Sequence, residues 1–265
     1  MKKIFILGLG SQKSGTTWVS NQLELCPSFQ PGLTKEYHVL DKYHAQKRRN
    51  LRDLGSKQLQ LAAMRLSIET YADHFNSLFH RLPSTTHVAD ITPSYSLCNV
   101  NILKEAKKQI TERGFSIKVF FHMRDPAMRL WSQVKMMNKI HKMGLNKNDE
   151  IDYFQRFSNS EAAKRRSDYP TIIRNINSIF NPEEVRIDFY ENMFTQEFAT
   201  SFSDFIELDD FVDCNLGQKI NATNSNEAYG KTLLSAIKSV RNNYSHIIEA
   251  IQTMYPTSLP SNWLD

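Results

Sequence analysis

The chain has 265 residues, of which 40% are hydrophobic, 23% charged and 11% aromatic. These values exclude a disordered, collagen-like or coiled-coil protein, so we expect a folded soluble protein with a single domain over residues 1–265. The 33 Lys and Arg against 28 Asp and Glu give a formal net charge of +5. That excess is too small to indicate a nucleic-acid-binding protein, but it is compatible with a groove for an anionic small molecule.

Cysteine usage and hydropathy bear on the compartment. The three cysteines, Cys26, Cys98 and Cys214, are far apart and form no C-x-x-C pair, which predicts neither a disulfide framework nor a metal site. The apolar run near Met1 is followed by no small-residue cleavage site, and no run reaches the roughly 20 apolar residues of a membrane helix. We therefore expect a cytoplasmic protein without a membrane span.

Strands and helices alternate along the predicted chain. Apolar runs bounded by turn residues predict strands at 3–9, 87–91, 117–123 and 185–189. Helical periodicity predicts helices at 16–25, at 58–82 as one long helix, at 99–113, at 126–140, after the last strand through 205, and within 226–253 as one helix or a pair. Residues 135–147, rich in lysine and methionine, are expected to be mobile and surface-exposed. This order predicts an α/β fold with three layers, α/β/α, around a central, mostly parallel sheet.

The strongest chemical signal is the sequence G-S-Q-K-S-G-T-T at residues 10–17, between the first strand and the first helix. Glycines let the backbone curl around an oxyanion, amides at the helix start point inward, and Lys13 adds a positive charge. The loop is P-loop-like and predicts a nucleotide-phosphate site. A Walker A loop would place its lysine directly after the second glycine, whereas Lys13 precedes Gly15. A P-loop kinase or nucleotide hydrolase is therefore disfavoured but stays open, as does a nucleotide-binding protein without catalysis.

A second segment follows the strand at 117–123. Arg124 stands at the carboxyl end of this strand, and Ser132 lies on the following helix. The planar fork of arginine suits a phosphate monoester, and both side chains can converge on one oxyanion. We interpret Arg129 as a helix-surface charge and Asp125 as a residue that orients the arginine turn.

These two segments resemble the signatures of the sulfotransferases that use 3′-phosphoadenosine 5′-phosphosulfate (PAPS). The sequence K-S-G-T-T-W is similar to their 5′-phosphosulfate loop, P-K-S-G-T-T-W, with Gln12 in place of the proline, and the segment from Arg124 to Ser132 is similar to R-D-P-x-x-R-x-x-S. The resemblance implies a sulfotransferase that uses PAPS and releases 3′-phosphoadenosine 5′-phosphate (PAP). We expect no metal requirement, because a sulfuryl group carries less negative charge than a terminal phosphoryl group, and Lys13, the loop amides and the helix start can stabilise the leaving phosphate. By the same resemblance, Arg124 and Ser132 bind the 3′-phosphate, Lys13 also acts in catalysis, and the 5′ end of the nucleotide contacts Lys13, Ser14, Gly15, Thr16, Thr17 and Trp18.

A third segment, K-E-Y-H-V-L-D at residues 35–41, resembles the K-E-x-H-F-F-D segment of bacterial and heparan-type sulfotransferases. In those enzymes the glutamate is the proposed base. The resemblance implies that Glu36 takes a proton from a hydroxyl or amine of the acceptor, which is a small molecule or a glycan. His38 is the rival base because aryl and steroid sulfotransferases use histidine, and we favour Glu36.

Two further segments carry weaker resemblances. The sequence D-I-T-P-S-Y, which begins at Asp90, is similar to the E-x-T-P-x-Y segment of the family. There, residues at the end of the strand face the acceptor, and Asp90 holds the acidic position. Residues 219–223 resemble a loop that closes over the nucleotide in some members.

Overall fold

The computed structural model describes residues 2–44, 55–213 and 230–264. Its strands are β1 (Ile4–Gly8), β2 (His87–Ile91), β3 (Ser116–Met123) and β4 (Val185–Phe189). Its α-helices are α1 (Thr16–Leu23), α2 (Ser56–Leu66), α3 (Ile68–Phe79), α4 (Val100–Glu112), α5 (Pro126–His141), α6 (Lys147–Ser158), α7 (Glu161–Ser167), α8 (Tyr169–Asn177), α9 (Gln196–Ile206), α10 (Gly230–Asn243) and α11 (Ser245–Met254). The four strands lie where the sequence predicts them.

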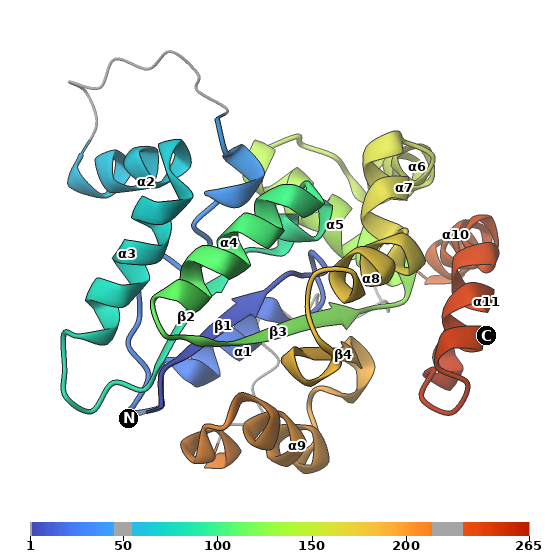
Figure 1. Cartoon of the computed structure of the whole chain (residues 1–265). Helices are drawn as coiled ribbons and strands as arrows, with labels where there is room; N and C mark the ends of the chain where they lie inside the picture. Colours follow the sequence, from blue (N-terminus) through green and yellow to red (C-terminus); the bar gives the residue numbers. More distant parts are fainter. Residues whose placement is uncertain (1, 45–54, 214–229, 265) are drawn as a thin grey trace.

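The four strands form one parallel sheet in the order β2-β1-β3-β4. The connection after β1 passes through α1, which packs in the core on one face of the sheet. The connection after β3 passes through α5, which packs in the core on the other face (Figure 1). Neighbouring parallel strands whose connections diverge in this way leave a crevice at their carboxyl ends, where ligands of open α/β sheets bind. The loops after β1 and β3 therefore meet at the expected binding edge.

Helices cover both faces of the sheet and give the predicted α/β/α layers. Side chains of β1 alternate between the faces, as in any strand. Phe5 and Leu7 pack in a core with α3, α4 and α8, and Ile4 and Ile6 pack in a second core with α1 and α9. In Figure 1, α4 and α8 lie in front of the sheet and α1 behind it. The α/β fold with a central parallel sheet is confirmed.

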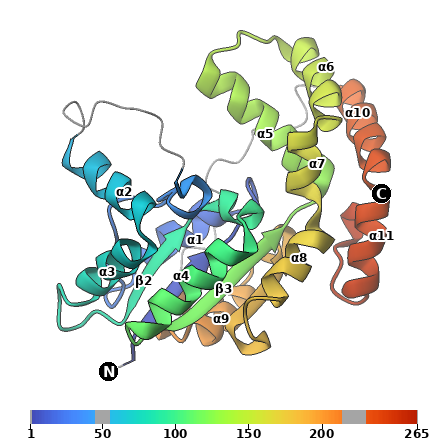
Figure 2. The same cartoon turned by 45° about the horizontal axis from the view of Figure 1, so that its top comes forward.

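A group of helices extends the domain beyond the carboxyl end of β3. Figure 2 shows α5, α6, α7 and α10 together, on the side of the sheet away from α2 and α3. Lys135 and Asn138 of α5 donate hydrogen bonds to Glu150 of α6, at 3.0 Å and 2.6 Å. The expectation of an exposed segment at 135–147 is therefore wrong for residues 135–138, which are half-buried in α5 against α6, whereas residues 139–142 are exposed as expected. The expected mobility stays a prediction. Within the described residues, no helix is both long and apolar enough to cross a bilayer.

The long helix predicted over 58–82 is two helices, α2 and α3. They are separated by Ser67, which has extended backbone angles (φ −145°, ψ 121°) and whose side chain accepts a hydrogen bond from the Thr70 amide. A serine that caps a helix in this way competes with a continuous helix through the same residue. The apolar residues keep helical spacing on both sides of Ser67, so the sequence pattern does not predict the break between α2 and α3.

Candidate active site

The loop after β1 continues the pairing between β1 and β3 and then turns. The Ser11 amide donates to the His122 carbonyl, and the His122 amide donates to the Gly10 carbonyl, both at 2.8 Å. Gly15 ends the turn with φ 80°, and a Cβ there would lie 2.8 Å from the side chain of Met193. Only glycine fits that conformation and spacing without strain. The loop is thus held on the sheet at one end and against a buried methionine at the other.

The loop leads directly into the first turn of α1. Gly15 is the N-cap residue and supplies no side-chain hydrogen bond, and the first turn contains no acidic residue. The amides of an uncapped helix start and the helix dipole both favour a bound anion. The start of α1 is therefore suited to an anion, and binding of a phosphate at Thr16 stays a prediction.

Lys13 adds positive charge to this loop from a strained backbone position. Its φ of 73° lies in the left-handed region, which non-glycine residues adopt rarely and mostly where the surroundings enforce it. Burial lowers the pKa of Lys13, and the nearby positive charges of Arg124 and Lys35 lower it further, while Glu36 opposes them. Three cations and one carboxylate therefore act on each other across this site.

Lys35 is a site residue to which the sequence assigned no role. Its Nζ donates to the hydroxyls of Thr16, at 3.3 Å, and Thr17, at 2.9 Å, and to Glu36 Oε1 at 3.1 Å. Its amine therefore lies at the start of α1, although 18 residues separate it from Thr17. The available signal was its position beside Glu36 in the K-E-Y-H sequence, but only the tertiary structure shows that it reaches the loop.

Glu36 and His38 lie side by side and form the centre of a chain of polar side chains. His38 Nε2 lies 3.3 Å from Glu36 Oε2, and His38 Nδ1 lies 2.9 Å from Asp41 Oδ2. The Ser94 hydroxyl donates to the same Asp41 oxygen at 2.6 Å. The sequence paired Glu36 and His38 as rival bases, and the structure brings them into direct contact.

This arrangement determines the protonation states of the pair. The hydrogen bonds to Asp41 and then to Glu36 raise the pKa of His38 to about 9. Burial alone would raise the pKa of Glu36, but its hydrogen bond with His38 and the charge of Lys35 outweigh burial and lower it. At neutral pH His38 is therefore an imidazolium and Glu36 a carboxylate, so Glu36 is the group able to accept a proton.

Asp90 is buried in the core, whereas the resemblance predicts a residue that faces the acceptor. It has no exposed surface, and its carboxylate accepts hydrogen bonds from the hydroxyls of Tyr71, at 2.9 Å, Thr92, at 2.6 Å, and Tyr95, at 2.8 Å. Burial raises the pKa of Asp90 to about 6, although these hydrogen bonds oppose the shift. The resemblance of the D-I-T-P-S-Y sequence gives the position along the chain, but the three hydroxyls turn the side chain into the core.

The hydroxyls that Asp90 orients hold the loop that carries Glu36 and His38. The Thr92 hydroxyl accepts a hydrogen bond from the Tyr37 amide at 2.9 Å, and the Tyr95 hydroxyl accepts one from the Val39 amide at 3.0 Å. On the opposite side, Arg65 of α2 donates to the His38 carbonyl at 2.9 Å. His38 keeps a left-handed backbone, φ 50°, under these restraints. Residues 37–39 are thus fixed by backbone contacts on both sides.

Arg124 joins the loop after β3 to the loop after β1. Its Nη1 donates to the Lys13 carbonyl at 3.0 Å, and its guanidinium lies 4.3 Å from the centre of the Tyr190 ring. The Tyr169 hydroxyl in turn donates to the Arg124 carbonyl at 2.7 Å. The two segments that suggested phosphate binding therefore meet at the crevice between β1 and β3.

Ser132 and Trp18 are less directly placed at this crevice. Ser132 is 8% exposed and lies two turns into α5, and among the described residues no hydrogen bond joins it to Arg124. Trp18 is 2% exposed, and its ring packs edge-on against Phe194 and Phe211. Trp18 anchors α1 in the core beneath the loop. Ser14 is also buried, with its Oγ 2.6 Å from Ser11 Oγ.

Arg129 is a buried residue, so its interpretation as a surface charge is wrong. It has no exposed surface and donates to Gln133, at 3.0 Å, and to the Ser167 hydroxyl of α7, at 2.7 Å. Asp125 caps α5 by accepting the Met128 amide and pairs with Arg241 of α10 at 2.7 Å. Both side chains bind helices of the packed group to one another and do not orient Arg124 through a side-chain contact.

Residues 219–223, with their resemblance to a nucleotide-closing loop, lie outside the described residues. Over the ranges that the structure describes, no group of three or more His, Cys, Asp and Glu side chains is arranged to hold a metal ion. Cys26 and Cys98 are not joined in a disulfide.

The sheet order, the glycine loop before α1 and the crevice between β1 and β3 define a P-loop-like α/β fold. No protein-family model matches the chain, and no curated protein matches it. The structure is similar to a sulfotransferase from Alicyclobacillus acidocaldarius, with a TM-score of 0.64, 13% identity, and coverage of 100% of this chain and 99% of that chain. It is also similar to the sulfotransferase domain from the curacin biosynthetic pathway, with a TM-score of 0.50, 16% identity, and coverage of 98% and 99%. The chain therefore has the sulfotransferase fold.

Proposed function

We propose that the protein is a sulfotransferase that moves a sulfuryl group from PAPS to a hydroxyl or amine of an acceptor. The observation that carries this proposal is the site itself, in which a carboxylate, Glu36, contacts Lys35 at the start of α1, and Lys13 and Arg124 add positive charge in the adjoining loops. The cations Lys13, Lys35 and Arg124 suit a highly anionic nucleotide. The carboxylate suits removal of a proton from a neutral acceptor.

The residues of the chain would divide the reaction between them. Glu36 accepts the proton of the acceptor as the acceptor oxygen or nitrogen forms a bond to sulfur. The bond between sulfur and the bridging oxygen of PAPS breaks, and that oxygen leaves with the electron pair as the phosphate of PAP. Lys13 and the α1 amides stabilise the negative charge that grows on this leaving oxygen. His38, as an imidazolium, orients Glu36.

The experiment is transfer of labelled sulfate from PAPS to a pool of hydroxylated and amino acceptors, including sugars, phenols and hydroxy acids. We expect transfer that is lost in Glu36→Gln, by about 10²–10⁴ in turnover, and that persists in a chelator. A P-loop kinase would instead label acceptors from the γ-phosphate of ATP and require magnesium. Phosphoryl transfer that is abolished by chelation and restored by magnesium would replace our proposal with the kinase.

A further inference from the structure

A pocket of about 350 Å³ lies next to the pair formed by Glu36 and His38. This volume is near the lower end of the range for small-molecule sites, roughly 300–1,000 Å³. The pocket lies between the short helix Leu40–Lys42, the short helix Pro93–Leu97, α4 and α7. Its lining residues are Leu40, Asp41, Tyr43, Ser94, Leu97, Cys98, Asn99, Ile102 and Arg166.

The pocket is connected to the proposed base through one side chain. Asp41 and Ser94 line it, and both lie within hydrogen-bond distance of His38 Nδ1, at 2.9 Å and 3.2 Å. The other nitrogen of the same ring lies 3.3 Å from Glu36. Asp41, Ser94 and the His38 ring therefore lie between a molecule in the pocket and Glu36, so that only a side arm that extends past these groups brings a hydroxyl or amine to Glu36.

The lining combines apolar surface with one cation that has no counter-charge. Across the described parts of the chain, Arg166 pairs with no Asp or Glu, and its guanidinium donates only to the Ala162 carbonyl of its own helix, at 3.3 Å. Burial lowers the pKa of Arg166, and the neighbouring Arg165 lowers it further, which shows that its charge is poorly compensated. Asp41 also lines the pocket, but it forms no ion pair with Arg166, and its Oδ2 contacts His38 and Ser94.

We propose that this pocket binds the acceptor, and that the acceptor is a small alcohol or amine with an apolar body and an oxyanion, such as a carboxylate. Arg166 binds the oxyanion, since its planar fork matches carboxylate geometry. The apolar body packs against Leu97 and Ile102, and the reacting hydroxyl or amine extends past His38. The assignment as an acceptor site rests on the proposed sulfotransferase function.

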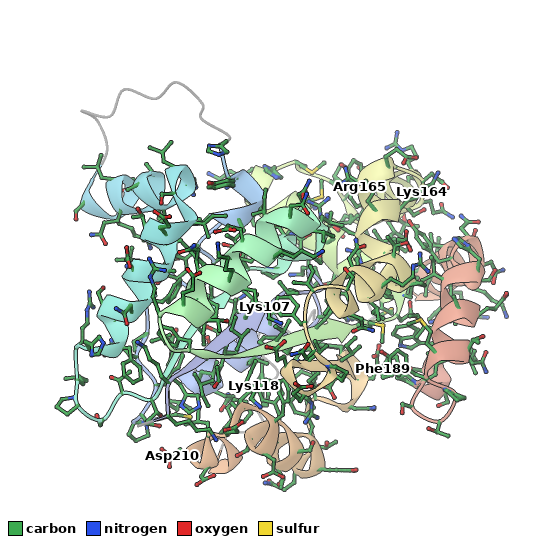
Figure 3. All side chains as sticks on the ribbon, viewed as in Figure 1. Lys107, Lys118, Lys164, Arg165, Phe189 and Asp210 are labelled. Atoms are coloured by element: carbon green, nitrogen blue, oxygen red, sulfur yellow. The ribbon has the colours of Figure 1, made fainter. Side chains whose placement is uncertain are left out.

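A neighbouring arginine provides a matched control. Arg165 precedes Arg166 on α7 and is exposed. Figure 3 shows Arg165 and Lys164 on α7, away from the sheet. Arg165→Gln removes the same charge from the same turn without touching the pocket, so it separates a general electrostatic effect from binding by Arg166.

The test measures binding first, without PAPS. Hydroxyaryl and hydroxyalkyl carboxylates are titrated into the protein alongside their neutral amides, and binding is followed by calorimetry and ligand-observed NMR. We expect at least one carboxylate to bind about ten- to a hundredfold more tightly than its amide. The Arg166→Gln variant should bind the carboxylate and its amide equally well, whereas Arg165→Gln should keep the preference for the carboxylate. The inference is overturned if no carboxylate binds better than its amide, or if the difference survives in Arg166→Gln with melting curves that show a folded variant.

Turnover assays then separate this inference from the proposed function. With PAPS and a carboxylate acceptor, Arg166→Gln raises the KM for the acceptor about ten- to a hundredfold and leaves the KM for PAPS unchanged. Binding that depends on Arg166 without sulfuryl transfer from PAPS would leave the pocket assignment standing and refute the sulfotransferase. Sulfuryl transfer that is equally efficient for the carboxylates and their amides would support the sulfotransferase and refute the assignment of the pocket.

Discussion

His38 lies between the carboxylates of Glu36 and Asp41. The proposed reaction should therefore have a measurable dependence of kcat on pH. The pKa of His38 is about 9 and that of Glu36 is below its usual value. Both groups therefore keep one charge state from weakly acidic to weakly alkaline pH. We expect kcat to be level over this range and to fall as His38 loses its proton near pH 9, because Glu36 then loses the donor that orients it.

The opposite assignment gives the opposite profile. If neutral His38 were the base, kcat would rise with pH through about 9 and reach its plateau only above that value. In our account His38→Gln keeps a donor toward Glu36 and removes the alkaline fall near pH 9, whereas Glu36→Gln lowers kcat over the whole range. A rising profile in the natural protein, together with a mild effect of Glu36→Gln, would transfer the role of base to His38.

The imidazolium also makes a contribution to stability with a definite sign. Since the pKa of His38 is raised on folding, its protonated form stabilises the folded state below the unfolded pKa, near 6.5. That contribution is lost as the pH rises through about 9. Thermal melting between pH 6.5 and pH 9.5 should therefore show a smaller fall in His38→Gln than in the natural protein. Parallel curves for the two proteins would contradict the contacts of His38 with Asp41 and Glu36.

Lys13 has a separate role on the side of the sulfuryl donor. Its left-handed backbone places the amine where Arg124 and Lys35 also raise the local positive charge. Lys13→Ala should lower kcat by about 10²–10³, the range for loss of one preorganised donor at a developing charge. Circular dichroism should show an unchanged fold. Near-normal turnover in a folded variant would remove Lys13 from the mechanism.

At the scale of elements, the loop at residues 37–40 is held in place by Tyr95, in the short helix that follows β2. The Tyr95 hydroxyl donates to Asp90 and accepts the Val39 and Leu40 amides, at 3.0 Å and 3.4 Å. Tyr71 donates to the same carboxylate, but the structure assigns it no bond to the loop. The hydroxyls of these two buried tyrosines therefore share the bond to Asp90 and differ in their contact with the loop.

This difference gives a matched pair of variants. Tyr95→Phe and Tyr71→Phe should each cost about 1–2 kcal/mol of unfolding free energy, since each removes a buried hydroxyl bonded to Asp90. Only Tyr95→Phe should lower kcat, by about ten- to a hundredfold, because a small misplacement of Glu36 slows the reaction. PAP affinity should stay within about twofold in both. Equal turnover in the two variants would show that the loop does not depend on Tyr95.

The elements also show what the sequence can predict. The strands, the loop at residues 10–17 and the start of α5 at Pro126 carry local signals, which are apolar runs, glycines and a proline at the first helical turn, and all are confirmed. The burial of Arg129 depends on Ser167, 38 residues later, and the burial of Asp90 depends on three hydroxyls from two elements. Such contacts leave no periodic pattern in the chain. Lys35 is a similar case, since its role depends on the return of the chain to α1.

At the scale of the whole molecule, the sheet order brings distant segments into one site. Because β1 lies between β2 and β3, the glycine loop after β1 meets Arg124 after β3 on one side. On the other side, residues 35–41 lie along the end of β2, where the Ile91 amide donates to the Lys35 carbonyl at 3.2 Å. The cations are thus gathered at the crevice between β1 and β3, and Glu36 stands at its edge toward β2. This geometry is compatible with the proposed nucleotide on one side and the proposed acceptor on the other.

The proposed function depends most directly on a preference of the site for a nucleotide that carries a 3′-phosphate. Calorimetric titration of the protein with PAP and with ADP compares a nucleotide that carries a 3′-phosphate with one that carries a second phosphate at the 5′ end. We expect PAP to bind at least tenfold more tightly, because charged hydrogen bonds to the 3′-phosphate at Arg124 have no counterpart in ADP. Arg124→Ala should reduce the difference in affinity between PAP and ADP. Equal affinities, or tighter binding of ADP, would contradict the assignment of this crevice to PAPS.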